Sequence, residues 1–354
     1  MLRLPERLVP RSHPFTAHVP SLTNKEGILY DVVGVGNALV DMIAMVDDAF
    51  LASNDMVKGS MALIETDRAV HLSTAVGAST RTSGGSGANT IAGIASLGGD
   101  VAFIGKVADD EFGDVFAADM KTVGVDFRSG APDSSVPTGR CIIAVTPDAQ
   151  RTMNTFLGIS TQLSFSDLDS DIISAGAVLY LEGYLFDRDE AKDAFRQAAA
   201  VAHAHGRVVS LTLSDSFCVD RHRADFLSLV RNDIDILFAN EDELKSLYET
   251  ADFDEAVELL RRDCHIAAVT RSEKGSVVVT RDDIHTVPAA PVASVVDTTG
   301  AGDLFAAGFL RGLTQGKDLT SCARIGAIAA AEVISHVGPR PLVSLASLLP
   351  ADLQ

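Results

Sequence analysis

The stretch "VVDTTGAGDLFAAGFLRGL", Val295 to Leu313, changes character twice. It starts as an apolar run, breaks into "DTTGAGD", and then resumes with apolar residues at helical spacing. The pattern predicts a buried strand that ends near Asp297 and a helix that begins at Gly300. The carboxylates, hydroxyls and glycines between these two elements make the turn the first candidate for chemistry.

A helix that begins at Gly300 would present the free backbone N–H groups of Gly300, Ala301 and Gly302 at its N-terminus. Together with the positive end of the helix dipole, these donors predict an anion site that a phosphoryl group can approach closely. Asp303 lies inside the same turn, where it could take a proton from a substrate hydroxyl as that hydroxyl attacks.

Two more polar residues lie on the outer side of this turn. Asp297 and Thr299 could bind a monovalent cation or could order the loop. A capped helix with glycine turns is the structural alternative for the whole motif, but it explains only one of the two aspartates.

The rest of the chain has the pattern of an α/β protein. From Tyr30 onward, apolar runs that end in glycine or polar residues alternate with helical segments. Near-continuous apolar strands in this order predict a mostly parallel sheet covered by helices on both faces, a three-layer α/β/α sandwich. Ligands bind such sheets at the carboxyl ends of the strands, which is where the polar clusters fall.

Shorter strands break this rhythm near residues 41–47, 56–64, 125–130, 138–146 and 150–157. They predict a small β-sheet lid, formed by about 41–65 and 125–158, that would exclude water from the strand ends. Residues 1–27 contain prolines and lack a helical or strand period, so we expect a disordered or tag-like extension before a domain of residues 28–354.

The composition limits the partners. Of the 354 residues, 47% are hydrophobic and 22% are charged, which is ample for a large core. The net charge of −19 disfavours nucleic acid and anionic membranes as partners, and no apolar run is long enough to span a bilayer. Four cysteines without a CxxC pair favour reduced thiols in a cytoplasmic protein. An acidic protein that binds an anion needs local positive charge.

Two motifs resemble the signatures of one family. "DTTGAGDLFAAGFL" resembles the C-terminal signature of the ribokinase-like (PfkB) carbohydrate kinases, and "GGSGANTIAGIASLGG", Gly84 to Gly99, resembles the N-terminal one. The resemblance runs from about Tyr30 to the C-terminus, and the adenosine kinase branch is the most similar, through "VVGVGNALVDMIAMVDDAFL" and "DILFANEDEL". It implies a kinase that uses ATP, Mg²⁺ and K⁺ to phosphorylate the 5′-hydroxyl of adenosine in purine salvage, as a monomer or homodimer.

The resemblance also assigns roles around the acceptor. It makes Asp303 the general base and the Gly300–Gly302 backbone the anion hole. The ribose hydroxyls would be bound by Asp41, and the residues that assist it are Asn37, Gly85, Ser86 and Asn89. Carboxylates and amides suit a vicinal diol. The structural alternatives are a strand-end turn for Asp41 and helix capping for Ser86 and Asn89.

Arg151 corresponds to a lid arginine that neutralises the transferring phosphate, although a solvated surface arginine is the alternative. Met153, Leu157 and Tyr184 match positions that enclose the purine, and ordinary packing would explain them as well. Glu182 stands where the animal adenosine kinases usually have an uncharged residue. Its carboxylate could hydrogen-bond a hydroxyl or amine of the acceptor, or mark a different substrate.

On the nucleotide side, Asn240 and Glu243 match the element that orders magnesium-bound water and phosphate, with a helix N-terminal charge cluster as the alternative. Thr270 and Gly275 belong to a loop that resembles the nucleotide-side loop. His336 lies in a segment that resembles the one flanking the base of ATP, or is a surface residue.

Other functions stay open at this point. A kinase for another nucleoside or for a free sugar such as ribose shares the same motifs, although Met153, Leu157 and Tyr184 favour an acceptor that carries a base. A catalytically silent ligand-binding regulator is the alternative from another class, and the intact Asp303 and Arg151 argue against it.

Overall fold

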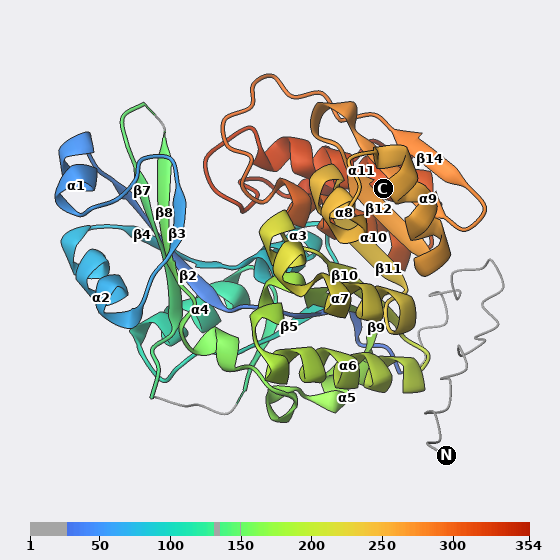
Figure 1. The fold of residues 1–354 in the computed structure, drawn as a ribbon, viewed down its shortest axis with the longest axis horizontal. Coiled ribbons are helices and arrows are strands. Elements are labelled where there is room, and N and C mark those ends of the chain that lie inside the picture. Colours follow the sequence, from blue (N-terminus) through green and yellow to red (C-terminus); the bar gives the residue numbers. More distant parts are fainter. Residues whose placement is uncertain (1–26, 131–134, 149) are drawn as a thin grey trace, which may run out of the picture.

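The structure is a computed structural model that describes residues 27–130, 135–148 and 150–354. The N-terminal extension expected over residues 1–27 therefore lies, except for Gly27, outside the described residues. The rest forms a large sheet between two layers of helices and a smaller sheet to one side (Figure 1).

The strands of the described chain are β1 (Tyr30–Val35), β2 (Leu39–Met45), β3 (Met61–Leu63), β4 (Thr80–Gly84), β5 (Val101–Gly105), β6 (Asp126–Ser129), β7 (Gly139–Val145), β8 (Arg151–Phe156), β9 (Gly176–Glu182), β10 (Val208–Thr212), β11 (Ile236–Asn240), β12 (Ile266–Thr270), β13 (Ser276–Thr280) and β14 (Ile284–Val287). The α-helices are α1 (Asp48–Ser53), α2 (Thr66–Ala75), α3 (Ser86–Ser96), α4 (Glu111–Thr122), α5 (Ser170–Ala175), α6 (Asp189–Ala204), α7 (Ser216–Asn232), α8 (Glu241–Tyr248), α9 (Phe253–Asp263), α10 (Ala301–Thr314) and α11 (Leu319–Val333). Short 3₁₀ helices are η1 (Gly158–Gln162), η2 (Phe165–Asp167), η3 (Gly183–Asp187), η4 (Ser272–Lys274) and η5 (Leu345–Leu348).

The large sheet has the strand order β14-β13-β12-β11-β10-β9-β1-β5-β6 among the described residues. Along this order, the neighbouring strands from β12 to β6 are parallel, and only β13 and β14, at one edge, pair antiparallel. One apolar core packs α3, α4, α10 and α11 on one face, and a second packs α6, α7, α8 and α9 on the other (Figure 1). The predicted three-layer fold is confirmed.

Strand β1 lies at the point where the strand order changes direction. It pairs with β5 on one side and with β9 on the other. Ligands of open α/β sheets bind at such a switch point, beyond the carboxyl ends of the strands. Asn37 follows β1 and Glu182 ends β9, so both residues lie at this position.

The smaller sheet, which we call the lid, has the order β3-β8-β7-β2-β4. One of its faces packs against α1 and α2 through an apolar cluster that includes Met42 and Ile142. On the opposite face, Asp41, Cys141 and Thr155 form one cross-strand row, and Ile43, Ile143 and Met153 form the next. We call this second face the underside of the lid.

The boundaries of the lid differ from the prediction in two ways. Residues 126–129, expected in the lid, form β6 and pair with β5 in the large sheet. Thr80–Gly84, which has no apolar alternation to mark it, forms the lid strand β4 and pairs with β2. The lid is therefore built from segments within residues 39–84 and 139–156.

The strand expected before Asp297 is absent from the described chain. Residues 291–298 have no regular secondary structure, and Val295 and Val296 are 59% and 48% exposed. An apolar pair at the surface of a loop has the same sequence pattern as the end of a buried strand, which explains the error. No helix among the described residues is both long enough and apolar enough to cross a bilayer.

Candidate active site

The turn before α10 has the backbone that the sequence predicts. Gly300 is the N-cap of α10 with a φ of 81°, and a Cβ there would lie 2.9 Å from Pro339. Only glycine fits this position without strain. Gly302 is exposed, and among the described residues a Cβ built on it would meet no atom within 4 Å. The first turn of α10 therefore opens onto free space, as an anion site requires.

One of the three expected amide donors is already used. The N–H of Ala301 donates to the carbonyl of Thr298 at 3.2 Å. In the described part of the chain, the N–H groups of Gly300 and Gly302 have no backbone acceptor. These two donors remain available at the positive end of the helix dipole.

The carboxylate of Asp303 faces the N-terminal part of α3. Its Oδ1 accepts a hydrogen bond from Ser86 Oγ at 2.7 Å, and its Oδ2 accepts one from Asn89 Nδ2 at 3.0 Å. Burial raises the pKa of Asp303, and the two hydrogen bonds and the charge of Arg340 oppose that rise. The structure thus brings the expected base together with two of the expected acceptor-binding residues, and a raised pKa suits a base that works near neutrality.

Asp41 projects from the underside of the lid without a partner. The residue is 7% exposed, and no described side chain or backbone group hydrogen-bonds its carboxylate. Burial raises its pKa to about 6, although the charges of Arg340 and Arg151 lower it. Gly84 leaves room for this carboxylate, because a Cβ there would lie 2.5 Å from Asp41 Cγ. A buried carboxylate without hydrogen bonds is a group that a ligand hydroxyl would satisfy.

Arg151 at the start of β8 connects the lid to the turn of residues 297–302 at the start of α10, which we call the anion turn. Its Nη1 donates to the carboxylate of Asp297 and lies 3.3 Å from Thr299 Oγ1. Its Nε and Nη2 are buried and have no partner in the described chain. The guanidinium is therefore fixed beside the turn while two of its donor atoms remain free, and the surface-arginine alternative does not apply.

Asp297 and Thr299 order the loop in this structure. Asp297 Oδ1 accepts from the N–H and the hydroxyl of Thr299, at 3.0 and 2.7 Å, and Oδ2 accepts from Gly338 N at 2.9 Å and from Arg151. A monovalent cation at this carboxylate would have to displace Arg151. The side chains as arranged here therefore do not fit a K⁺ site, and of the two expected roles the ordering role is the one observed.

The carboxylate of Glu182 is hydrogen-bonded within the protein. The residue is 1% exposed, its Oε1 accepts from Asn37 Nδ2 at 2.9 Å, and its Oε2 accepts from the N–H groups of Asn37 and Gly87 at 3.1 and 2.8 Å. The expected contact with a hydroxyl or amine is therefore replaced by contacts within the protein. Glu182 supplies the cap of α3, because the N-cap residue Gly85, at φ 97°, has no side chain to do so. Burial raises the pKa of Glu182 to about 7.

Asn37 is also held within the protein. It is 2% exposed, its amide nitrogen donates to Glu182, and its Oδ1 lies 2.8 Å from the hydroxyl of Ser160. Direct binding of ribose by Asn37 would need one of these hydrogen bonds to break. Its role in the acceptor site stays a prediction.

The underside of the lid is apolar between Asp41 and Arg151. Cys141, Ile143 and Val145 form a buried cluster there, and Ile43 and Met153 pack against it. Met153 is half-buried in the middle row of this face, and its contact with a flat base stays a prediction.

Leu157 and Tyr184 lie outside the strands of the lid. Leu157 follows β8 and is half-buried. Tyr184 is half-buried, its N–H donates to Ser214 Oγ at 3.1 Å, and its hydroxyl donates to the carbonyl of Ser214 at 3.3 Å. Packing accounts for both residues in this structure, so their contact with a purine stays a prediction.

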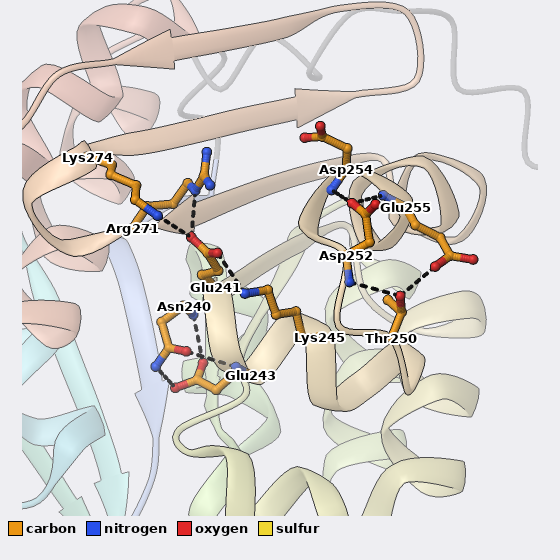
Figure 2. A network of polar contacts seen from close by, with 10 residues as sticks. All are labelled: Asn240, Glu241, Glu243, Lys245, Thr250, Asp252, Asp254, Glu255, Arg271 and Lys274. Carbon is orange, nitrogen blue, oxygen red and sulfur yellow. Dashed lines mark hydrogen bonds and ion pairs between the residues drawn. The ribbon is translucent and has the colours of Figure 1, made fainter.

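Asn240 and Glu243 cap helix α8 reciprocally (Figure 2). Asn240 donates to the carboxylate of Glu243 from N and Nδ2, at 2.9 and 2.6 Å, and Glu243 N donates to Asn240 Oδ1 at 2.8 Å. Burial raises the pKa of Glu243 to about 7. Among the described residues no three His, Cys, Asp or Glu side chains gather to hold a metal. A Mg²⁺ ion near Glu243 would therefore need water and phosphate oxygens as ligands, which is how Mg²⁺ often binds.

The loop between β12 and β13 is fastened to the start of α8. Glu241 accepts from Arg271 Nε at 2.8 Å and from Lys245 Nζ at 2.7 Å, with Lys274 Nζ at 3.8 Å (Figure 2). The hydrogen bonds from Arg271 and Lys245 lower the pKa of Glu241 to about 2. The expected nucleotide-side residues Thr270 and Gly275 end β12 and precede β13, so this network holds their loop at the carboxyl ends of β11 and β12.

His336 is paired within the C-terminal segment. Its Nε2 lies 3.2 Å from Glu332 Oε1, and its Nδ1 lies 3.3 Å from the carbonyl of Val337. Its half-buried ring is therefore not the exposed surface group of the alternative, and a contact with nucleotide stays a prediction.

Sequence reasoning missed Arg340. Its Nε donates to Asn89 Oδ1 at 2.8 Å, and its Nη2 donates to the carbonyl and the hydroxyl of Ser83, both at 3.0 Å. An arginine between two prolines has no periodicity that marks it as buried. Its one signal was a positive charge within a segment already matched to the nucleotide side.

Comparisons with known proteins match this chain to one family and to several solved structures. The model of the pfkB family carbohydrate kinases matches residues 52–344. The crystal structure of adenosine kinase from Sinorhizobium meliloti is 53% identical, with a TM-score of 0.82 over 90% of this chain and 98% of that chain. A probable sugar kinase from Rhizobium etli is 47% identical, with a TM-score of 0.83 over 90% and 97%. Fructokinase-1 of rice is 29% identical over 66% of this chain and 74% of its own length.

Proposed function

The chain belongs to the pfkB family of carbohydrate kinases, and we propose that it transfers a phosphoryl group from ATP to the 5′-hydroxyl of adenosine, giving AMP. The observation that carries this proposal is the position of Asp303. Its carboxylate lies at the first turn of α10 and accepts hydrogen bonds from Ser86 and Asn89. A base and an anion site are thereby adjacent, as phosphoryl transfer to a hydroxyl requires.

In the proposed reaction, Asp303 accepts the proton of the attacking hydroxyl. The N–H groups of Gly300 and Gly302 stabilise the negative charge on the phosphoryl oxygens, and such donors contribute about 3 kcal/mol each. Arg151 offers Nε and Nη2 to the same charge. Mg²⁺, when bound through water near Glu243, would neutralise the phosphates of ATP.

The lid supports adenosine as the acceptor. Asp41 has an unsatisfied carboxylate for ribose hydroxyls, and the apolar row of Ile43, Ile143 and Met153 lies beside it. A purine would bury apolar surface against this row, whereas a bare sugar would leave it without a partner. The similarity to the adenosine kinase of Sinorhizobium meliloti points the same way.

A free sugar is the second candidate. The similarity to rice fructokinase-1 and to the probable sugar kinase of Rhizobium etli favours it. We further propose a cytoplasmic location, because Cys141, Cys218, Cys264 and Cys322 are buried and form no disulfide in the described chain.

Consumption of ATP should be measured with adenosine, guanosine, inosine, uridine, ribose and fructose as acceptors, and the product from adenosine should be identified as 5′-AMP. We expect kcat/KM for adenosine to exceed that for either sugar by at least about 100-fold, since loss of a buried apolar group of this size costs several kcal/mol. A preference for ribose or fructose would overturn the nucleoside assignment. Absence of turnover with every acceptor would favour a silent regulator.

A further inference from the structure

Arg340 links three parts of the active site. Its Nε donates to Asn89 on α3, its Nη2 donates to Ser83 on the lid strand β4, and Nη2 also lies 3.7 Å from Met120 Sδ on α4. Its backbone neighbour Pro339 packs against Gly300 in the anion turn. A single side chain therefore contacts the lid and the helix that holds the acceptor-binding residues.

The contact with Asn89 determines which way that amide faces. Arginine can only donate hydrogen bonds, so the amide oxygen of Asn89 faces Arg340 Nε at 2.8 Å. The amide nitrogen then faces Asp303 Oδ2 at 3.0 Å. If the amide turned over, its oxygen would face the carboxylate of Asp303, and an attraction would become a repulsion.

Arg340 also supplies positive charge inside an acidic site. Its charge lowers the pKa of both Asp41 and Asp303, and Asp119 lies near enough to stabilise the guanidinium in return. Its Nη1 is buried and has no hydrogen-bond partner in the described chain. A buried guanidinium with an unused donor is costly, so its position calls for an explanation in terms of the carboxylates around it.

We propose that Arg340 is a positioning residue for phosphoryl transfer, which fixes the amide of Asn89 so that it donates to Asp303 and which keeps Asp303 ionised. This inference depends on the proposed function only through the assignment of Asp303 as the base. It does not depend on which acceptor the enzyme uses.

The direction of the effect on pH follows from the charge. Five other titratable groups lie close enough to interact electrostatically with Asp303. They are Asp41, Tyr180, Glu182, Tyr184 and Glu243. The three carboxylates among them oppose ionisation of Asp303, and Arg340 favours it. Removal of the guanidinium should therefore raise the pKa of Asp303 and move the acid limb of the kcat–pH profile to higher pH.

The test uses Arg340→Met, which keeps the length of the side chain and removes its charge, and Arg340→Lys, which keeps the charge but not the paired hydrogen bonds. Arg324→Met is the control, because Arg324 lies on α11, its side chain is 45% exposed, and within the described residues it forms an ion pair only with the surface residue Asp352. The pKa of Asp303 is read from the carbon-13 titration of its carboxyl group, assigned with Asp303→Asn. This measurement needs no turnover, so it remains informative even if the proposed function fails.

For Arg340→Met we expect the pKa of Asp303 to rise by about one unit, kcat to fall about 10- to 100-fold, and the acid limb to move in parallel. The effects of Arg340→Met and Asn89→Ala on kcat should be non-additive, since one residue acts through the other. Arg340→Lys should keep the pKa near that of the wild type and lose about 10-fold in kcat. A pKa of Asp303 that moves by less than about 0.3 units in Arg340→Met, or full activity of Arg340→Lys if the Met variant does not fold, overturns the proposal.

Discussion

Replacement of Asp303 by asparagine tests the proposed base most directly. The change removes the group that accepts the proton but keeps the shape of the side chain. In the variant, the amide oxygen can accept from Asn89 Nδ2 and the amide nitrogen can donate to Ser86 Oγ, so both hydrogen bonds of the wild type have a counterpart. The hydroxyl of Ser86 makes this possible, because it can accept as well as donate.

The expected magnitudes separate catalysis from folding. A positioned general base contributes about 100- to 10,000-fold, which corresponds to about 3–5 kcal/mol of the activation barrier. Loss of charge from two hydrogen bonds costs about 1–2 kcal/mol, and removal of a buried carboxylate whose pKa is raised by burial offsets part of that cost. We therefore expect the free energy of unfolding to change by no more than about 1 kcal/mol while turnover falls by at least 100-fold.

The assay is a coupled measurement of ATP consumption with saturating adenosine, combined with calorimetric titration of adenosine and urea unfolding of the same preparations. Asp318→Asn is the control, since Asp318 is the N-cap of α11 and asparagine caps as well as aspartate. If Asp303→Asn keeps more than about a tenth of the wild-type rate, Asp303 is not the base. If adenosine binding falls as much as turnover, Asp303 binds the acceptor without taking its proton.

Four further substitutions separate other roles. Arg151→Ala should lower kcat about 100-fold and change the Kd of adenosine by less than about threefold, because Nε and Nη2 of Arg151 are available to phosphate. A selective loss of adenosine binding would instead assign Arg151 to the purine base of the acceptor. Gly300→Ala should lower the free energy of urea unfolding by about 1–3 kcal/mol, since φ is positive there and the new Cβ would meet Pro339. Gly302→Ala should leave stability unchanged but lower kcat/KM for ATP at least about 10-fold, because its Cβ would enter the open anion site. Equal effects of the two substitutions on both readouts would refute the open anion site. Burial raises the pKa of Glu182 from 4.5 to about 7, so the folded protein should lose about 3 kcal/mol of stability as pH rises from about 4.5 to 7. Glu182→Gln should not show that loss. If the free energy of unfolding changes with pH in the same way for both proteins, this assignment of Glu182 is wrong.

The sequence predicts the elements that have strong local signals. The glycines of the anion turn, the start of α10 within one residue, and the parallel sheet of buried strands such as "GAVLYLE" in β9 all follow from composition and periodicity. Asp303 is more than two hundred residues from Ser86 and Asn89 in the chain, yet the family resemblance places all three in one site, and the structure does bring them together.

The predictions fail where tertiary contacts determine the secondary structure or the burial of a residue. "TRTSG" forms β4 because β2 offers a free edge, not because its own residues favour a strand. Val295 and Val296 form no strand because they lie at the surface of a loop. Glu182 ends an apolar run and Arg340 lies between two prolines. Their hydrogen bonds to Asn37 and Asn89 become visible only in the folded structure.

The central position of β1 has a consequence for synthesis of the protein. One neighbour, β5, begins at Val101, but the other, β9, begins at Gly176. At about 5–20 residues per second, a ribosome needs roughly 7–30 s to extend the nascent chain from β1 to β9. During that interval one edge of an apolar strand has no partner and can pair with a neighbouring nascent chain. Yield in a heterologous host should therefore depend on translation speed and on holdase chaperones more strongly than the stability of the finished protein suggests.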